Sequence, residues 1–185
     1  MYCHSKKHAF PWWGCLGLLL LLSGLWALLK DIEIWNTVWY VPAWYGYLLM
    51  LDGAIFRQSG KSFLSHRKRE TGAMLFWSAP FWYLFEAYNF ALQNWYYVSG
   101  LHTNWAAFLF GWTAFATVLP ACFFHARWVQ TTGWFGHTRW EPLNVRPRVK
   151  RFMWVSGGCC AVFPLVFPHT AFWMVWGATL GIPEV

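Results

Sequence analysis

Two uninterrupted apolar stretches decide the fold class: GCLGLLLLLSGLWALL at residues 14–29 and WAAFLFGWTAFATVLPACFF at residues 105–124. A helix needs about 20 apolar residues to cross the roughly 30 Å hydrocarbon core of a membrane. The strands of a membrane β-barrel would alternate polar and apolar residues, whereas both stretches are apolar on every side. We therefore predict an all-α integral membrane protein.

The composition of the whole chain agrees with this class. Of its 185 residues, 58% are hydrophobic and 23% aromatic, and only 11% are charged, which is more apolar than an ordinary globular domain. Apolar runs between charged breaks predict one transmembrane domain, a polytopic bundle of five to six helices. The expected helices cover about residues 10–29, 36–56, 72–97, 105–126, 150–166 and 170–183.

The last apolar stretch, residues 152–183, is too long for one ordinary span and short for two. Pro164 and Pro168 lie near its middle, and each proline disfavours helical conformation in the residue before it. We expect a break within PLVFPHT, residues 164–170. The alternative is a single kinked helix followed by an interfacial tail.

Basic residues mark the orientation of the chain. They precede the first expected helix and follow the second and fourth, so that Lys30 alone falls on the opposite side. The positive-inside rule then predicts a cytoplasmic N-terminus in the cell inner (cytoplasmic) membrane. The first helix is expected to be a retained anchor, because no small-residue cleavage site follows it. The net charge of +7 is thus assigned to topology and anionic lipid headgroups, and we expect no nucleic-acid partner.

The third expected helix contains an unusual carboxylate within FWYLFEAYNFALQNWYY, residues 81–97. Polar and aromatic side chains recur there at spacings of three and four, which places them on one helical face: Trp82, Glu86, Asn89, Gln93 and Tyr97. An ionised carboxylate facing lipid at mid-membrane costs at least about 3 kcal/mol. Glu86 should therefore point into the bundle, either as a hydrogen-bond clamp between helices or as part of a functional site.

A second carboxylate, Asp52, lies in LLMLDGAIFRQ near the end of the second expected helix. One interpretation is a structural ion pair with Arg57 at the membrane interface. The other is a catalytic site in which Glu86 and Asp52 act as acid and base and Asn89 assists.

Ligand-binding candidates follow from the polar face and from histidines near the membrane surface. A tetrapyrrole could take an axial imidazole from His102 or His169, which otherwise form interfacial hydrogen bonds. The complete candidate set is Trp82, Glu86, Asn89, Gln93, His102 and His169. Deep aromatic grooves would suit a lipid, a carotenoid, a quinone or a chlorin. The five cysteines show no metal-ligand spacing, so we interpret them as packing residues and expect no metal site.

Two functional hypotheses remain. The first is a non-enzymatic accessory subunit of a larger membrane complex, respiratory or photosynthetic, that contacts other membrane subunits and holds lipid or pigment. The small residues SGGCCA, 156–161, would let a partner helix approach closely. The second is a membrane-embedded enzyme acting on a lipid or isoprenoid. Carotenoid cyclases likewise combine short helices with intramembrane carboxylates, although no motif of theirs aligns with this chain.

Overall fold

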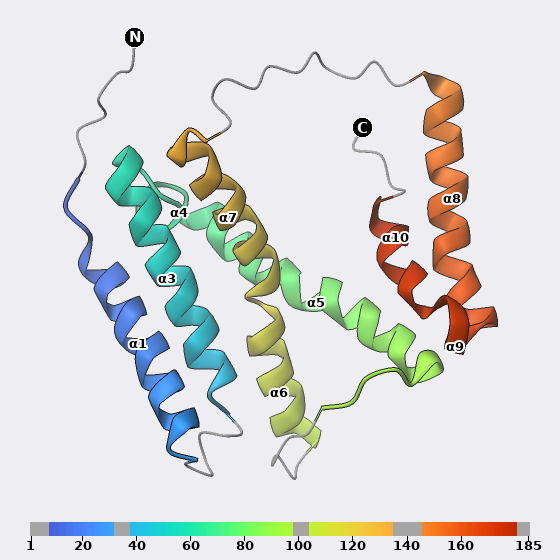
Figure 1. The fold of residues 1–185 in the computed structure, drawn as a ribbon, viewed down its shortest axis with the longest axis horizontal. Helices are drawn as coiled ribbons and strands as arrows, with labels where there is room; N and C mark the ends of the chain where they lie inside the picture. The colour runs from blue at the N-terminus through green and yellow to red at the C-terminus, as the bar shows by residue number, and fades with distance from the viewer. Residues whose placement is uncertain (1–7, 32–37, 98–103, 135–145, 181–185) are drawn as a thin grey trace. The chain divides into compact units, whose positions relative to one another are not determined.

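The computed structural model describes residues 8–31, 38–97, 104–134 and 146–180, and all regular secondary structure within these ranges is helical (Figure 1). The chain divides into two compact units. The first unit comprises Met1–Phe81 and Ser99–Thr138, and the second comprises Trp82–Val98 and Arg139–Val185. Helix α5 begins in the first unit and ends in the second.

The helices are named in Figure 1. Those of the first unit, including the start of α5, are α1 (Trp12–Leu29), α3 (Tyr40–Ser59), α4 (Phe63–His66), α5 (Lys68–Leu92), α6 (Asn104–Phe115) and α7 (Val118–Thr132). The second unit holds the end of α5, α8 (Pro147–Val166), α9 (Pro168–Ala171), the 3₁₀ turn η1 (Phe172–Met174) and α10 (Val175–Leu180).

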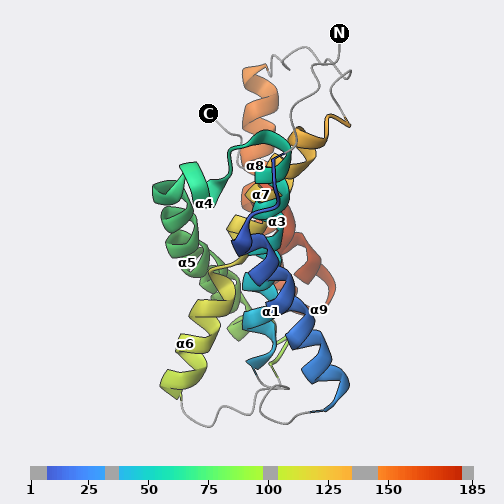
Figure 2. The ribbon, with the colours of Figure 1, turned by 90° about the vertical axis from the view of Figure 1, so that its left-hand side faces the viewer.

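Helices α1 and α3 run antiparallel, side by side (Figures 1 and 2), and their backbones touch at glycines. A Cβ atom added to Gly17 would lie 2.5 Å from the carbonyl oxygen of Gly46, and one added to Gly46 would lie 2.7 Å from that of Gly17. A second close contact follows one turn away on α1 and two turns away on α3, where a Cβ atom added to Gly53 would lie 2.9 Å from the Cα of Gly14. Small residues at helical spacing therefore permit this close contact, as they do between membrane helices in general.

The apolar core of the first unit lies where α3 and α7 meet. Its buried members are Leu48, Leu51, Ile55, Phe63, Ala121 and Phe124. The rings of Phe63 and Phe124 are stacked with their centroids 4.4 Å apart. This stacking holds the short helix α4 against α7, and two backbone amides of α4 donate to the Asp52 carboxylate on α3.

The expected helix over 105–126 is interrupted: α6 ends at Phe115 and α7 begins at Val118. Pro120 contributes to the break because it has no backbone N–H to continue the helical ladder. The hydroxyl of Ser78, on α5, donates to the Phe115 carbonyl at 2.5 Å and accepts from the Leu119 amide at 3.0 Å. Ser78 is 1% exposed, so this inserted hydroxyl satisfies two backbone groups that the break would otherwise leave unpaired.

In the second unit, α10 lies alongside α8, as Figure 1 shows. Phe85 of α5 is buried and stacks on Trp176 of α10, with ring centroids 5.0 Å apart. Tyr88 donates a hydrogen bond from its hydroxyl to the Ala161 carbonyl of α8 at 2.9 Å. The end of α5 is thus held to both α8 and α10 by aromatic side chains.

The last apolar stretch breaks at Phe167, between α8 and α9, because Pro168 disfavours helical conformation there. The expected helix over 170–183 is replaced by α9, η1 and the six-residue α10, and residues 181–183 lie outside the described part. Within the described ranges, three helical segments are long and apolar enough to cross a membrane: Trp12–Leu29, Asn104–Thr132 and Pro147–Val166. A membrane protein is thereby indicated, with three spans supported rather than five to six.

Candidate functional site

Asp52 occupies a closed niche within the first unit, and its side chain is fully buried. Its Oδ1 atom accepts hydrogen bonds from the backbone amides of Phe63 at 2.9 Å and Leu64 at 3.2 Å. Its Oδ2 atom accepts from the Ser62 hydroxyl at 2.7 Å and from the Trp13 indole at 3.1 Å. Four donors therefore surround one carboxylate, which is how a buried charge is tolerated.

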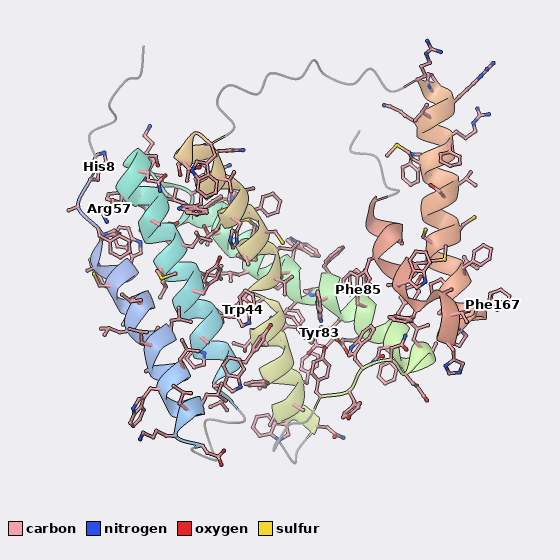
Figure 3. All side chains as sticks on the ribbon, in the orientation of Figure 1. His8, Trp44, Arg57, Tyr83, Phe85 and Phe167 are labelled. Carbon is pink, nitrogen blue, oxygen red and sulfur yellow. The ribbon has the colours of Figure 1, made fainter. Side chains whose placement is uncertain are left out.

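The expected ion pair between Asp52 and Arg57 is wrong. The Arg57 side chain is exposed, and the Arg57 carbonyl accepts from the amide of His8 at 2.9 Å, at the end of the α1–α3 hairpin seen in Figure 3. Backbone amides in the first turn of α4, and not the Arg57 guanidinium, bind the Asp52 carboxylate. Ser62 caps α4 in a capping box with Ser65 and presents two free amides of that turn to the carboxylate.

Glu86 is half-buried within the second unit and is surrounded by aromatic donors. Its Oε1 atom accepts from the hydroxyl of Tyr97 at 2.6 Å and from the indole of Trp82 at 3.2 Å. The indole of Trp95 lies 3.4 Å from both carboxylate oxygens. Oε1 is therefore crowded with donors, whereas the long bond from Trp95 is the one contact that the described residues make to Oε2.

Tyr97 reaches Glu86 by a chain reversal and not along the expected helix over 72–97. Helix α5 ends at Leu92, and Gln93 adopts a left-handed conformation with φ of 51°. Asn89 holds the reversal: its Oδ1 accepts from the amides of Asn94 and Trp95, and its Nδ2 donates to the Trp95 carbonyl at 2.6 Å. The structure thus assigns Asn89 a local capping contact that returns the following segment over Glu86.

A surface hollow of about 320 Å³ opens beside this carboxylate. It is lined by Glu86, Asn89, Phe90, Gln93, Trp95 and Tyr96. Phe90 and Tyr96 are among the most exposed aromatic side chains, at 87% and 86%. Burial and the hydrogen bond to Glu86 raise the pKa of Tyr97, beyond the helix end, to about 12. Tyr97 therefore remains a protonated donor at neutral pH. The hollow itself is lined by the Glu86 carboxylate and by aromatic side chains, which form its walls.

Of the two histidine candidates, only His169 is described, and it does not line this hollow. His169 is exposed on α9, and His102 lies outside the described residues. No group of three or more potential metal ligands occurs among the described residues. Of the candidate ligand-binding residues, Trp82, Glu86, Asn89 and Gln93 do lie together within the second unit.

The proposed acid–base pair gains no support from these contacts. Asp52 belongs to the first unit and Glu86 to the second, and each carboxylate has its own set of donors. Sequence reasoning did not identify Trp95 or Ser62 as their partners. The SFLS segment, residues 62–65, carries a serine at the first and fourth positions, and this weak capping signal could have indicated Ser62. No local signal marks Trp95, because the turn at Gln93 determines its position.

Comparisons with protein-family models, with curated proteins and with solved structures gave no match to this chain.

Proposed function

We propose that this protein is a non-enzymatic accessory subunit of a larger membrane complex, which packs against transmembrane helices of other subunits and holds lipid or pigment in its aromatic surfaces. The observation that carries the proposal is the outward face of α8. Only 11% of the apolar part of this helix is buried, and its small residues divide between two sides of the helix. Cys160 contacts Gly177 of α10, whereas a Cβ atom on Gly158 would meet nothing within 4 Å.

Gly158 and the exposed Cys159 therefore remain uncovered within the described part of the second unit. Small residues on a membrane helix allow another helix to come into close van der Waals contact, which lipid chains achieve less well. A transmembrane helix of another subunit is the occupant that this face suits best. The exposed aromatic side chains elsewhere on α8, such as Phe152 and Trp154, would contact lipid or pigment at the edge of that interface.

The native cysteine makes this proposal directly testable. A photoactivatable crosslinker is attached to Cys159 in native membranes, in a variant whose other cysteines are replaced by serine, because Cys15 and Cys122 are also exposed and would react. It should yield a discrete higher-mass product that contains a second membrane protein. The matched control is a variant that keeps Cys15, on α1, as its one cysteine. Crosslinks from Cys159 to lipid alone, together with migration of the native protein as a monomer, would contradict the proposal.

The alternative function, an enzyme that acts on a lipid or isoprenoid, depends on Glu86, since this carboxylate borders an open hollow while Asp52 is enclosed. In that case Glu86→Gln would abolish turnover and leave the fold intact. Under the accessory-subunit proposal the same variant would change ligand binding or assembly without affecting a chemical step.

A further inference from the structure

The hollow at the end of α5 has the chemistry of a cation site. Glu86 contributes a negative charge, and each of the donors that the structure records for it is neutral: two indoles and one phenol. Among the described residues no lysine, arginine or histidine forms an ion pair with Glu86, since the recorded pair joins Arg67 to Glu70. The charge of this carboxylate is therefore uncompensated within the described part of the unit.

The position of the hollow at a helix C-terminus adds to this negative potential. The last turn of α5 contains no basic residue, and the unpaired carbonyl groups there form the negative end of the helix dipole. The lysines and arginines of the second unit that the structure describes lie at the start of α8, at the far end of that helix from the end of α5 (Figure 1), and its described histidine, His169, is exposed on α9. None of them forms an ion pair with Glu86 among the described residues.

The aromatic side chains that line the hollow favour an ammonium group over a metal ion. Trp95 and Tyr96 line the hollow beside the carboxylate, and aromatic faces attract ammonium groups, quaternary ones included, by cation–π interaction. A metal ion would instead require several oxygen ligands in a compact shell. One carboxylate with aromatic walls resembles the cages that hold alkylammonium groups.

We propose that the hollow binds the ammonium headgroup of a zwitterionic phospholipid, with Glu86 Oε2 as its counter-ion. This inference rests on the lipid-binding part of the proposed function. Phe90 lines the hollow and is almost fully exposed, so an acyl chain leaving the headgroup would run along an apolar surface. A soluble amine has no acyl chain that could contact this apolar surface.

Native mass spectrometry of the full chain in detergent provides the test. Phosphatidylethanolamine, phosphatidylcholine and phosphatidylglycerol with identical acyl chains are each added, and the bound fractions are compared. We expect the two ammonium lipids to bind at least about tenfold better than phosphatidylglycerol, as one well-placed charge contact can provide. Glu86→Gln should reduce this preference to about twofold or less. The matched control, Glu70→Gln, alters an exposed carboxylate at the other end of α5 and should retain it.

A second variant covers the case in which Glu86→Gln does not fold. Tyr96→Leu removes one aromatic wall at a side chain that is 86% exposed, and it should lower the preference several-fold without affecting stability. The inference is overturned if the wild-type protein does not discriminate between headgroups, or if a folded Glu86→Gln or Tyr96→Leu variant discriminates as well as wild type. It is also overturned if free choline binds the hollow while no lipid preference is present.

The two proposals fail in different ways. A headgroup preference without any crosslinked partner would overturn the accessory-subunit proposal and leave the ammonium site standing. A crosslinked partner and bound lipid without headgroup preference would do the reverse.

Discussion

The contact between α1 and α3 can be tested by adding a single methyl group. In Gly17→Ala the new Cβ would lie 2.5 Å from the Gly46 carbonyl oxygen and 2.6 Å from the Met50 amide nitrogen. Both neighbours are backbone atoms, and unstrained carbon contacts need about 3.5 Å or more, so the two helices must separate by about 1 Å. Overpacking of this kind costs about 1–3 kcal/mol, and the better helix propensity of alanine offsets about 0.5–1 kcal/mol. We expect a net loss of about 1 kcal/mol, and of no more than about 2.5 kcal/mol.

Gly158→Ala is the matched control, because it is the same substitution inside another apolar helix where the added Cβ meets nothing within 4 Å. Only the propensity term remains, so this variant should be more stable than wild type by about 0.5–1 kcal/mol. The free energy of unfolding is measured for both variants in mixed detergent–SDS micelles. The reasoning is refuted if Gly17→Ala is as stable as Gly158→Ala, because the same methyl group would then have found equal space at both positions.

Three other perturbations test the polar contacts. Asp52→Asn presents an amide N–H₂ to donors that need an acceptor, so it should lower the free energy of unfolding by about 2–4 kcal/mol, whereas Glu70→Gln, at an exposed ion pair, should change it by less than about 1 kcal/mol; equal effects would contradict the buried niche. Ser78→Ala removes the hydroxyl that bridges the α6–α7 break and should cost about 1–3 kcal/mol in the same assay; no loss would mean that the two backbone groups bond each other directly. Because the pKa of Tyr97 is raised from 10.0 to about 12, its protonated form is favoured in the folded state, and its contribution to stability should be present below pH 10 and lost as the pH rises from 10 to about 12. Ultraviolet difference spectra of wild type against Tyr97→Phe would show ionisation of this phenol only above pH 11, and a normal titration near pH 10 would contradict the contact with Glu86.

The helical class was predictable because it depends on properties that each segment carries by itself. The run at residues 14–29 is apolar by composition. It must also be helical inside a membrane, since lipid offers no hydrogen-bond partner for backbone N–H and C=O groups. The positions at which helices are interrupted were harder to predict from the sequence. Pro168 indicated the end of α8, whereas the interruption between α6 and α7 also depends on Ser78, which lies 37 residues before Phe115.

The sequence by itself also determined that two carboxylates occur in apolar surroundings and would need partners, because an unpaired charge there is costly. Only the tertiary structure decided which partners they have. Asp52 meets Trp13, 39 residues away, because glycines let α1 and α3 approach closely enough for the indole to reach it. Glu86 meets Tyr97 because the left-handed residue that follows α5, Gln93, turns the chain back. Helical spacing describes only neighbours on one continuous helix, so contacts created by a chain reversal or by a second helix lie beyond it.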